Sequence, residues 1–328
     1  MSSTFPFSIS RLKECVATCI YSHPASISLY RQPTIEGDDH MIFLVDSNPD
    51  YIIRVTKPRE DGSRSYNGQE MQDRDIALRR LIQDEYRARC LDEHVIPCSI
   101  GTWQLSNDGE YVASLETKLQ GSGLHHESVA ELTVQGLKTF LSALKNINVK
   151  ELEQNLGNKM PSIPFPNYAS LRESAIEAWT RLVERGQISV KDIGDQESLN
   201  GLLEKKTSML EMIQHLTSEY RPTLVHNDIK GEHILVDPRS GRVTGILDWA
   251  DAGIGNPAVD IAGLVLTVGK DLAERIAREV GYGEIQILQG VLQARCECVM
   301  RLDDRLNGGD KLSPVGLLRD QLFLSLAD

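Results

Sequence analysis

The first third of the chain alternates short apolar runs with polar turns. Apolar residues recur at helical spacing over residues 8–21, which predicts an amphipathic helix at the start. Five apolar runs then have the length and composition of strands, with β-branched and aromatic residues prominent. The predicted strands are residues 27–30, 41–45, 51–55, 100–105 and 111–116. A helical pattern over residues 75–93 interrupts them, so this region predicts a small sheet with helices.

From Val129 onward the hydrophobic pattern is mainly helical. The predicted helices are residues 132–147, 171–183, 199–216, 261–268, 272–280 and 286–305. The change from strands to helices along the chain predicts an α+β protein. A length of 328 residues with 41% hydrophobic residues is enough to bury a core of this kind.

A group of acidic and imidazole side chains interrupts the helical region. The short β-type runs at residues 224–225, 234–236 and 243–247 predict strands, with Asp228 in the first loop, His233 at its end and Asp248 after the last run. A hairpin would bring the three side chains together. Carboxylates suit a magnesium ion shared with polyphosphate, and a further acid can orient a hydroxyl for phosphoryl transfer. The alternative is that these residues only cap turns.

The sequence of this region resembles the motif of a known family. The residues His226-Asn-Asp-Ile-Lys-Gly-Glu-His233, followed by Ile246-Leu-Asp-Trp249, are similar to the signature of the aminoglycoside phosphotransferase family, which includes choline kinases and macrolide phosphotransferases. The resemblance implies a protein-kinase-like, two-lobed fold with a small antiparallel sheet in the first lobe. It places a nucleotide-binding lobe at residues 1–116 and a catalytic, acceptor-binding helical lobe at residues 117–328.

The resemblance also implies roles for three aspartates. Asp228 would be the catalytic residue that accepts or orients the substrate hydroxyl, and Asp248 would bind the metal. Asp260, in the segment Asn256-Pro-Ala-Val-Asp260, matches an aspartate that braces the loop.

Three residues depart from the family signature. Asn227 replaces the commonest glycine, Lys230 replaces a histidine, and His233 replaces the metal-binding asparagine. An imidazole at His233 can ligate a metal or hydrogen-bond a phosphate-bound water, and it points to the macrolide and aminoglycoside branch. Lys230 is either a solvated charge or a neutralising group for the transferred phosphate.

The nucleotide lobe is expected to hold the donor phosphates through Arg54. This residue lies inside an apolar strand where kinases carry a lysine, and a buried guanidinium needs a carboxylate partner. Glu85, in the predicted helix 75–93, is the expected partner, and the charged segment before that helix is expected to be an insertion. Arg54 and Glu85 together are therefore predicted to serve the nucleotide.

Two further nucleotide contacts are expected from backbone. Gly37 lies in the turn between the first two strands and would cover the phosphates, although a lone glycine is most often only a turn residue. The backbone of Ser114, Leu115 and Glu116 is expected to meet the purine edge, which leaves ATP and GTP both open as donors.

The function that follows from the resemblance is a magnesium-dependent O-phosphotransferase. It would move the γ-phosphate of ATP or GTP to a hydroxyl of a small acceptor, either antibiotic-like or a metabolite. One alternative is a catalytically inactive, kinase-like module that senses nucleotide or binds a partner, because Asn227, Lys230 and the poorly glycine-rich loop depart from the family. Another is an atypical protein kinase, but no Ala-Pro-Glu segment follows Asp248.

The charge and hydropathy of the chain limit the classes of partner and location that we expect. A formal net charge of -12 disfavours a nucleic-acid backbone and is compatible with a cationic acceptor. The sequence shows neither an apolar run that would span a membrane nor a signal-peptide pattern, so a cytoplasmic location is expected. Acceptor identity and oligomeric state leave no signal in the sequence.

Overall fold

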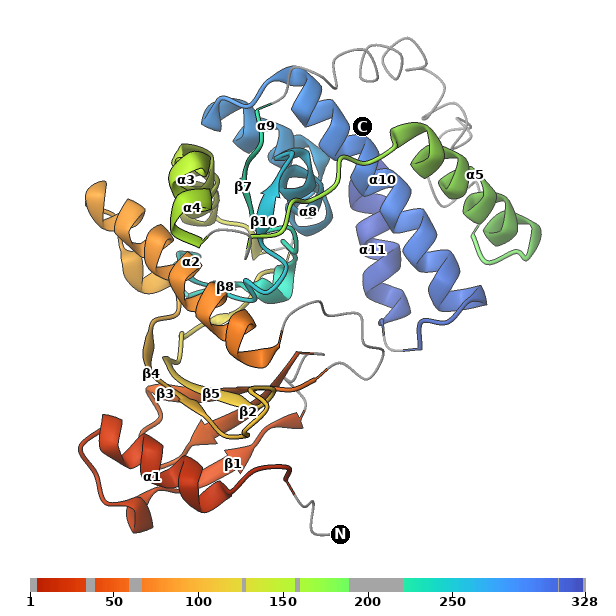
Figure 1. Ribbon diagram of the computed structural model, residues 1–328. Helices are drawn as coiled ribbons and strands as arrows, with labels where there is room; N and C mark the ends of the chain where they lie inside the picture. The colour runs from red at the N-terminus through yellow and green to blue at the C-terminus, as the bar shows by residue number, and fades with distance from the viewer. Residues whose placement is uncertain are drawn as a thin grey trace. The chain divides into compact units, whose positions relative to one another are not determined.

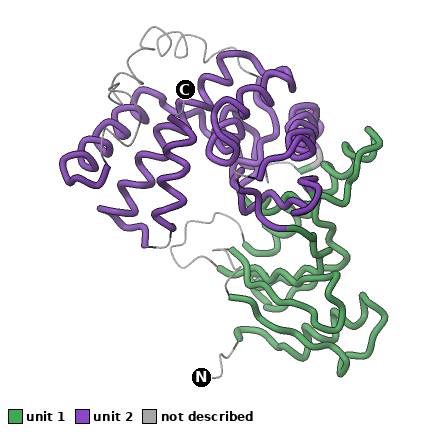
Figure 2. Tube along the Cα trace, turned by 180° about the vertical axis from the view of Figure 1, so that it is seen from behind, with its two compact units in different colours: residues 1–121, 156–159, 244–250 green, residues 122–155, 160–243, 251–328 purple. Residues whose placement is uncertain are grey.

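The computed structural model describes residues 5–33, 39–58, 67–125, 128–156, 160–188, 221–311 and 313–326. The chain divides into two compact units (Figure 2). The first comprises residues 1–121, 156–159 and 244–250, and the second comprises residues 122–155, 160–243 and 251–328. The first unit therefore extends past residue 116 and takes up two later segments. Strands in one region and helices in another confirm the predicted α+β class.

A five-stranded antiparallel sheet forms the centre of the first unit. Its strands are β1 (Leu29–Arg31), β2 (His40–Val45), β3 (Tyr51–Thr56), β4 (Ser99–Gln104) and β5 (Val112–Thr117). The order across the sheet is β1-β2-β3-β5-β4, and all neighbouring pairs are antiparallel. Each predicted strand is present, with ends that differ by one or two residues.

The two faces of this sheet differ in chemistry because side chains alternate along each strand. One face packs on α1 (Ile9–Cys19) and forms an apolar core. This core includes Leu12, Val16, Phe43, Ile53, Val55 and Leu115. The other face carries polar groups toward α2 (Gly68–Ala88), which lies on the opposite side from α1 in Figure 1.

Helix α2 begins seven residues before its predicted start. Asn67 accepts a hydrogen bond from the backbone of Glu70, and the Glu70 side chain accepts one from the backbone of Asn67. This capping box starts the helix, so the predicted insertion was drawn too long. Gly68 is required at the first position because a Cβ there would clash with the carbonyl of Glu110.

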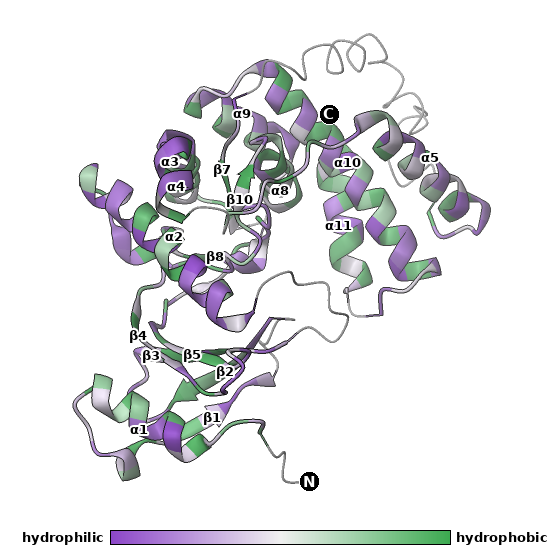
Figure 3. Ribbon diagram, in the orientation of Figure 1, coloured by the Kyte–Doolittle hydropathy of each residue, from purple (hydrophilic) through white to green (hydrophobic). Residues whose placement is uncertain are grey.

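The second unit is mainly helical. Its helices are α3 (Glu131–Asn146), α4 (Val149–Leu156), α5 (Tyr168–Glu184), α8 (Ala258–Val268), α9 (Lys270–Val280), α10 (Glu284–Asn307) and α11 (Val315–Leu326). Helix α8 is apolar along most of its length and buried against α9, α10 and α11 (Figure 3). The prediction missed α4 and α11, and its helix at 199–216 lies outside the described residues. Among the described helices, none is long and apolar enough to cross a membrane.

Two small sheets in the second part of the chain carry the polar loop. Strand β7 (Thr223–Val225) pairs antiparallel with β10 (Gly253–Gly255). Strands β6 (Ser122–Gly123), β8 (Ile234–Val236) and β9 (Val243–Ile246) form a separate sheet in the order β6-β8-β9. The loop after β7 therefore joins two sheets, and the expected hairpin is formed by β8 and β9.

Candidate active site

The loop between β7 and β8 has a backbone conformation that explains its unusual sequence. Asn227 has a φ of 64°, in the left-handed region where glycine is favoured and asparagine is the best tolerated of the larger residues. Its side-chain amide donates a hydrogen bond to the carbonyl of Asp251 at 3.2 Å. Glycine and asparagine both tolerate this backbone conformation, so the loop suits either residue at position 227.

Asp260, in the first turn of α8, braces the start of this loop. Its two carboxylate oxygens accept hydrogen bonds from the backbone nitrogens of His226 at 3.0 Å and Asn227 at 2.8 Å. Burial raises the pKa of Asp260 to about 7, although these two hydrogen bonds favour the charged form. The bracing contact implied by the resemblance is present.

The predicted acids and imidazole come together. One ligand atom from each of Asp228, His233 and Asp248 lies within 4.8 Å of the others. His233 directly precedes β8, and Asp248 follows β9 after one residue, so the pairing of these strands sets the local arrangement. Asp248 has a φ of 59°, and strained residues of this kind concentrate at functional sites. The adjacent Trp249 is fully buried and anchors the segment by donating to the Ile246 carbonyl.

Asp228 is held from two sides. The Nδ1 atom of His233 lies 2.9 Å from the Asp228 carbonyl oxygen and 3.3 Å from its Oδ2. The Nζ atom of Lys230 lies 3.2 Å from the same Oδ2. Asp228 remains 28% exposed and His233 12% exposed, so the group is open to a ligand while its orientation is fixed. Lys230 is thus an ion-pair partner of the predicted catalytic aspartate, and not only a solvated charge.

Arg54, the arginine predicted to contact the donor phosphates, has different partners from the one predicted. Arg54 donates to Asp75 Oδ2 at 3.1 Å and lies 3.7 Å from Glu116 Oε2. Glu85 instead pairs with Arg89 at 2.6 Å on the exposed side of α2. The expected Arg54–Glu85 pair was therefore wrong. The error follows from the predicted helix start, because Asp75 was taken as the first residue of the helix, whereas it lies about two turns inside it.

A second guanidinium joins the same acids. Arg79 donates two hydrogen bonds to the Glu116 carboxylate, at 2.9 and 2.8 Å, and lies 3.1 Å from Asp75 Oδ2. Burial alone raises the pKa of Glu116, but Arg79 and Arg54 together hold it below its usual value. Burial likewise opposes the charge on Arg54, whereas the carboxylates of Glu116, Asp75 and Asp248 raise its pKa. We refer to Arg54, Asp75, Arg79 and Glu116 as the buried quartet.

The expected backbone contact with a purine stays a prediction, and strand pairing involves the same stretch of backbone. Strand β5 has β3 on one side and β4 on the other, so the sheet uses the backbone groups of Ser114, Leu115 and Glu116. Leu115 points into the apolar core, and the Ser114 hydroxyl donates to Glu116 at 2.6 Å. Gly37 lies outside the described residues, so its predicted contact stays a prediction.

The family follows from a match over most of the chain. Residues 43–293 match the profile of a family described as "Phosphotransferase enzyme family". This chain belongs to that family.

Relatives of this phosphotransferase share parts of its sequence. It is 34% identical over 83 residues to viomycin phosphotransferase of Streptomyces vinaceus, covering 25% of this chain and 28% of that protein. It is 50% identical over 38 residues to the uncharacterized protein YcbJ of Bacillus subtilis, or 12% of each chain. The alignments thus span under a third of these curated relatives.

Solved structures show the same fold over nearly the whole phosphotransferase. The GDP complex of wild-type aminoglycoside 2'-phosphotransferase IIIa has a TM-score of 0.59 at 20% identity, with 96% of each chain covered. The streptomycin–ATP complex of APH(2")-IIa has a TM-score of 0.54 at 18% identity, covering 98% and 100% of the chains. Macrolide 2'-phosphotransferase type I has a TM-score of 0.51 at 17% identity, with 100% of each chain covered. The predicted kinase-like phosphotransferase fold is confirmed.

Asp75 and Arg79 are the site residues that sequence reasoning missed. The capping box at Asn67 and Glu70 was the available signal, because it starts α2 at Gly68 and places both residues well inside the helix. With that start, Asp75 and Arg79 fall one turn apart on one helix face. No comparable signal in the sequence shows that Glu116 points toward this face.

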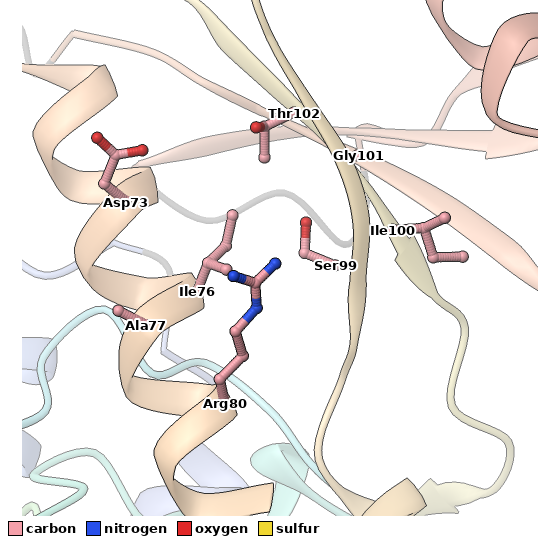
Figure 4. Close-up of a pocket in the computed structure, with 8 residues that line it drawn as sticks. All are labelled: Asp73, Ile76, Ala77, Arg80, Ser99, Ile100, Gly101 and Thr102. Atoms are coloured by element: carbon pink, nitrogen blue, oxygen red, sulfur yellow. The ribbon is translucent and has the colours of Figure 1, made fainter.

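A pocket of about 200 Å³ lies elsewhere in the first unit, between α2 and β4. Figure 4 shows the Arg80 side chain reaching from α2 toward Ser99, whereas Ile100 points away from the helix. Asp73 and Arg80 line it, on a different side of α2 from the buried Asp75 and Arg79. The pocket contains none of the predicted site residues, so it is separate from the candidate active site.

Proposed function

We propose that this phosphotransferase moves the γ-phosphate of ATP or GTP to a hydroxyl group of a small acceptor, with Mg²⁺ as cofactor. The observation that carries the proposal is the meeting of Asp228, His233 and Asp248 within 4.8 Å in a chain of this family. Two carboxylates and an imidazole at this spacing supply one group for the nucleophile and others for a metal.

Asp228 is proposed as the residue that receives the acceptor's proton. As the hydroxyl oxygen bonds to the γ-phosphorus, the bond from that phosphorus to the departing diphosphate breaks and the proton passes to the Asp228 carboxylate. The contacts from His233 and Lys230 support this role, because they hold the carboxylate in one orientation. Lys230 would in addition offset negative charge on the transferred phosphoryl group.

The residues present fit a magnesium ion. Asp248 supplies a carboxylate oxygen, the ligand type that Mg²⁺ prefers. His233 brings an imidazole nitrogen to the same group, and that nitrogen could ligate the ion or accept a hydrogen bond from a water bound to it. When bound, the ion would neutralise charge on the donor phosphates.

Arg54 is proposed as the protein's cationic contact to the donor phosphates. It is the most exposed member of the buried quartet, and Asp248 contributes to its electrostatic environment. Structural neighbours bound to GDP and to ATP support testing both donors.

The acceptor class is proposed to be a cationic hydroxyl compound. A net charge of -12 favours positively charged ligands through long-range attraction. The partial likeness to viomycin phosphotransferase, together with neighbours bound to streptomycin and gentamicin, makes viomycin, streptomycin and gentamicin the first compounds to screen.

Calorimetric titration of ATP and GTP, with and without Mg²⁺, tests the donor site. We expect magnesium-dependent binding in the wild-type protein and its loss in Asp248→Asn. Asp237→Asn is the matched control, since Asp237 only caps the turn between β8 and β9. Phosphate transfer to the screened acceptors is then followed by mass spectrometry.

Three outcomes decide between the candidate functions. Binding followed by transfer to a small hydroxyl compound supports the proposal. Absence of binding of either nucleotide contradicts it and favours an inactive, partner-binding protein. Phosphate on a protein substrate only would favour the protein-kinase alternative.

A further inference from the structure

The buried quartet is balanced in charge. Two guanidinium groups and two carboxylates sum to zero, and all four side chains belong to the first unit. The members differ in exposure, since Arg54 is 11% exposed and the other three are 1–2% exposed. Arg54 is therefore the member placed to meet a ligand, and Arg79 is the inner member.

The distances show which arginine engages which acid. Arg79 makes both close contacts to the Glu116 carboxylate, at 2.9 and 2.8 Å, whereas Arg54 approaches that carboxylate only to 3.7 Å. The Ser114 hydroxyl donates to the same carboxylate at 2.6 Å. Glu116 is thus neutralised mainly by Arg79, and Arg54 contacts it at longer range.

Asp75 is shared by both arginines, so neither guanidinium in the quartet lacks a carboxylate partner. Its Oδ2 atom receives both Arg54 and Arg79, each at 3.1 Å. Its Oδ1 atom is buried and has no hydrogen-bond partner among the described residues. If Arg79 were absent, Arg54 would face two carboxylates alone.

We propose that Arg79 is a positioning residue for donor binding: by neutralising Glu116 and sharing Asp75, it prevents the two carboxylates from holding Arg54 alone, so that Arg54 can engage the phosphates of the nucleotide. This inference rests on the proposed function. Without Arg79 the quartet carries a net charge of minus one, and charges buried in a low-dielectric region act strongly on a nearby polyphosphate. The effect should therefore depend on the ligand's phosphates and not on its base or ribose.

Binding of ATP, inorganic tripolyphosphate and adenosine to the full chain tests the proposal. Arg79→Met is expected to weaken ATP and tripolyphosphate by at least about tenfold, as for loss of a buried charge contact, and to leave adenosine unchanged. The double variant Arg79→Met/Glu116→Gln restores neutrality and is expected to recover most of the loss. Equal weakening of ATP and adenosine, or no recovery in the double variant, would overturn the proposal.

Two single variants keep the test decisive if Arg79→Met does not fold. Arg79→Lys retains the charge and is expected to bind ATP within about threefold of wild type, since Lys keeps the charge but not the two-pronged geometry. Glu116→Gln makes the quartet net positive and should bind ATP more tightly, with adenosine unaffected. Weaker or unchanged ATP binding in Glu116→Gln contradicts the charge-balance argument.

The same data separate this inference from the proposed function. Magnesium-dependent ATP or GTP binding in the wild type, with no specific effect of the quartet variants, overturns only the role of Arg79. A wild-type protein that binds neither nucleotide overturns the proposed function, and the inference with it. Circular dichroism of each variant shows that binding is compared between folded proteins.

Discussion

Two groups of charged residues in this protein use the same side-chain types in different surroundings. The buried quartet of the first unit is closed by short contacts and is at most 11% exposed. The group around Asp228 also pairs a carboxylate with a cation, but Asp228 and Lys230 are 28% and 30% exposed. The first group links strands to a helix and exposes only Arg54 to a small extent, whereas Asp228 and Lys230 in the second are both open to solvent.

This difference in exposure predicts whether a mutation lowers stability or activity. A partner removed from a buried pair leaves an uncompensated charge in a low-dielectric region, so the cost falls on stability. An exposed pair is worth little for stability because water replaces the lost partner. Changes near Asp228 should therefore cost activity, and changes in the quartet should cost stability first.

The largest effect is expected from Asp228→Asn on turnover. Loss of a positioned proton acceptor lowers kcat by about 10²- to 10⁴-fold. We expect nucleotide binding to persist and the melting temperature to change little. Turnover close to wild type with a bound acceptor would show that Asp228 is not the acceptor's base.

A large loss of stability is expected from Arg79→Met. Removing one partner from a buried, hydrogen-bonded ion-pair network lowers the free energy of unfolding by about 3–5 kcal/mol. Urea unfolding of the wild type and the variant would measure this loss. Arg278→Met is the matched control, because Arg278 also contacts two glutamates, Glu274 and Glu284, but on the surface. Equal losses in the two variants would contradict the role assigned to burial.

The quartet should also make the protein sensitive to acid. The pKa of Glu116 is lowered to about 2 by Arg79 and Arg54 despite burial, so its stabilisation is present above the unfolded-state pKa of about 4.3 and is lost as pH falls through the folded-state pKa. The free energy of unfolding should drop between about pH 5 and pH 2. Glu116→Gln should flatten that slope, and an unchanged slope would count against the prediction.

Asp260 should show the opposite sign. Burial raises its pKa to about 7, above the unfolded-state pKa of about 3.9. Its contribution to stability is therefore complete below the unfolded-state pKa and is lost as pH rises through the folded-state pKa. Asp260→Asn should therefore reduce the pH dependence of unfolding between about pH 4 and pH 7. A steeper slope in the variant would contradict this sign.

The smallest effect is expected at Asn227. Glycine relieves a left-handed strain of about 1 kcal/mol but loses the hydrogen bond to Asp251, worth about 1 kcal/mol, so Asn227→Gly should be near neutral. Asn227→Ala keeps the strain and loses the bond, so it should be the less stable variant by thermal unfolding. The reverse order would remove the conformational reason for this departure from the family signature.

The sequence predicted the strands of the first unit well because alternation along a strand is a local property. The prediction failed at the beginning of α2, where the Asn67–Glu70 capping box was overlooked. Because of that error, Glu85 was predicted as the partner of Arg54 in place of Asp75. The prediction also missed that β5 is paired on both sides, since pairing order is not written in any one strand.

The sequence by itself determined the class of fold, the family and the order of Asp228, His233 and Asp248 along the chain. These follow from periodicity and from residue types at fixed spacing, which need no distant contact. Only the tertiary structure decided that Arg54 and Arg79 share Asp75 and Glu116, residues up to 62 positions apart when Arg54 and Glu116 are compared. The physical reason is that a buried charge takes whichever partner the packing of strand against helix brings within reach.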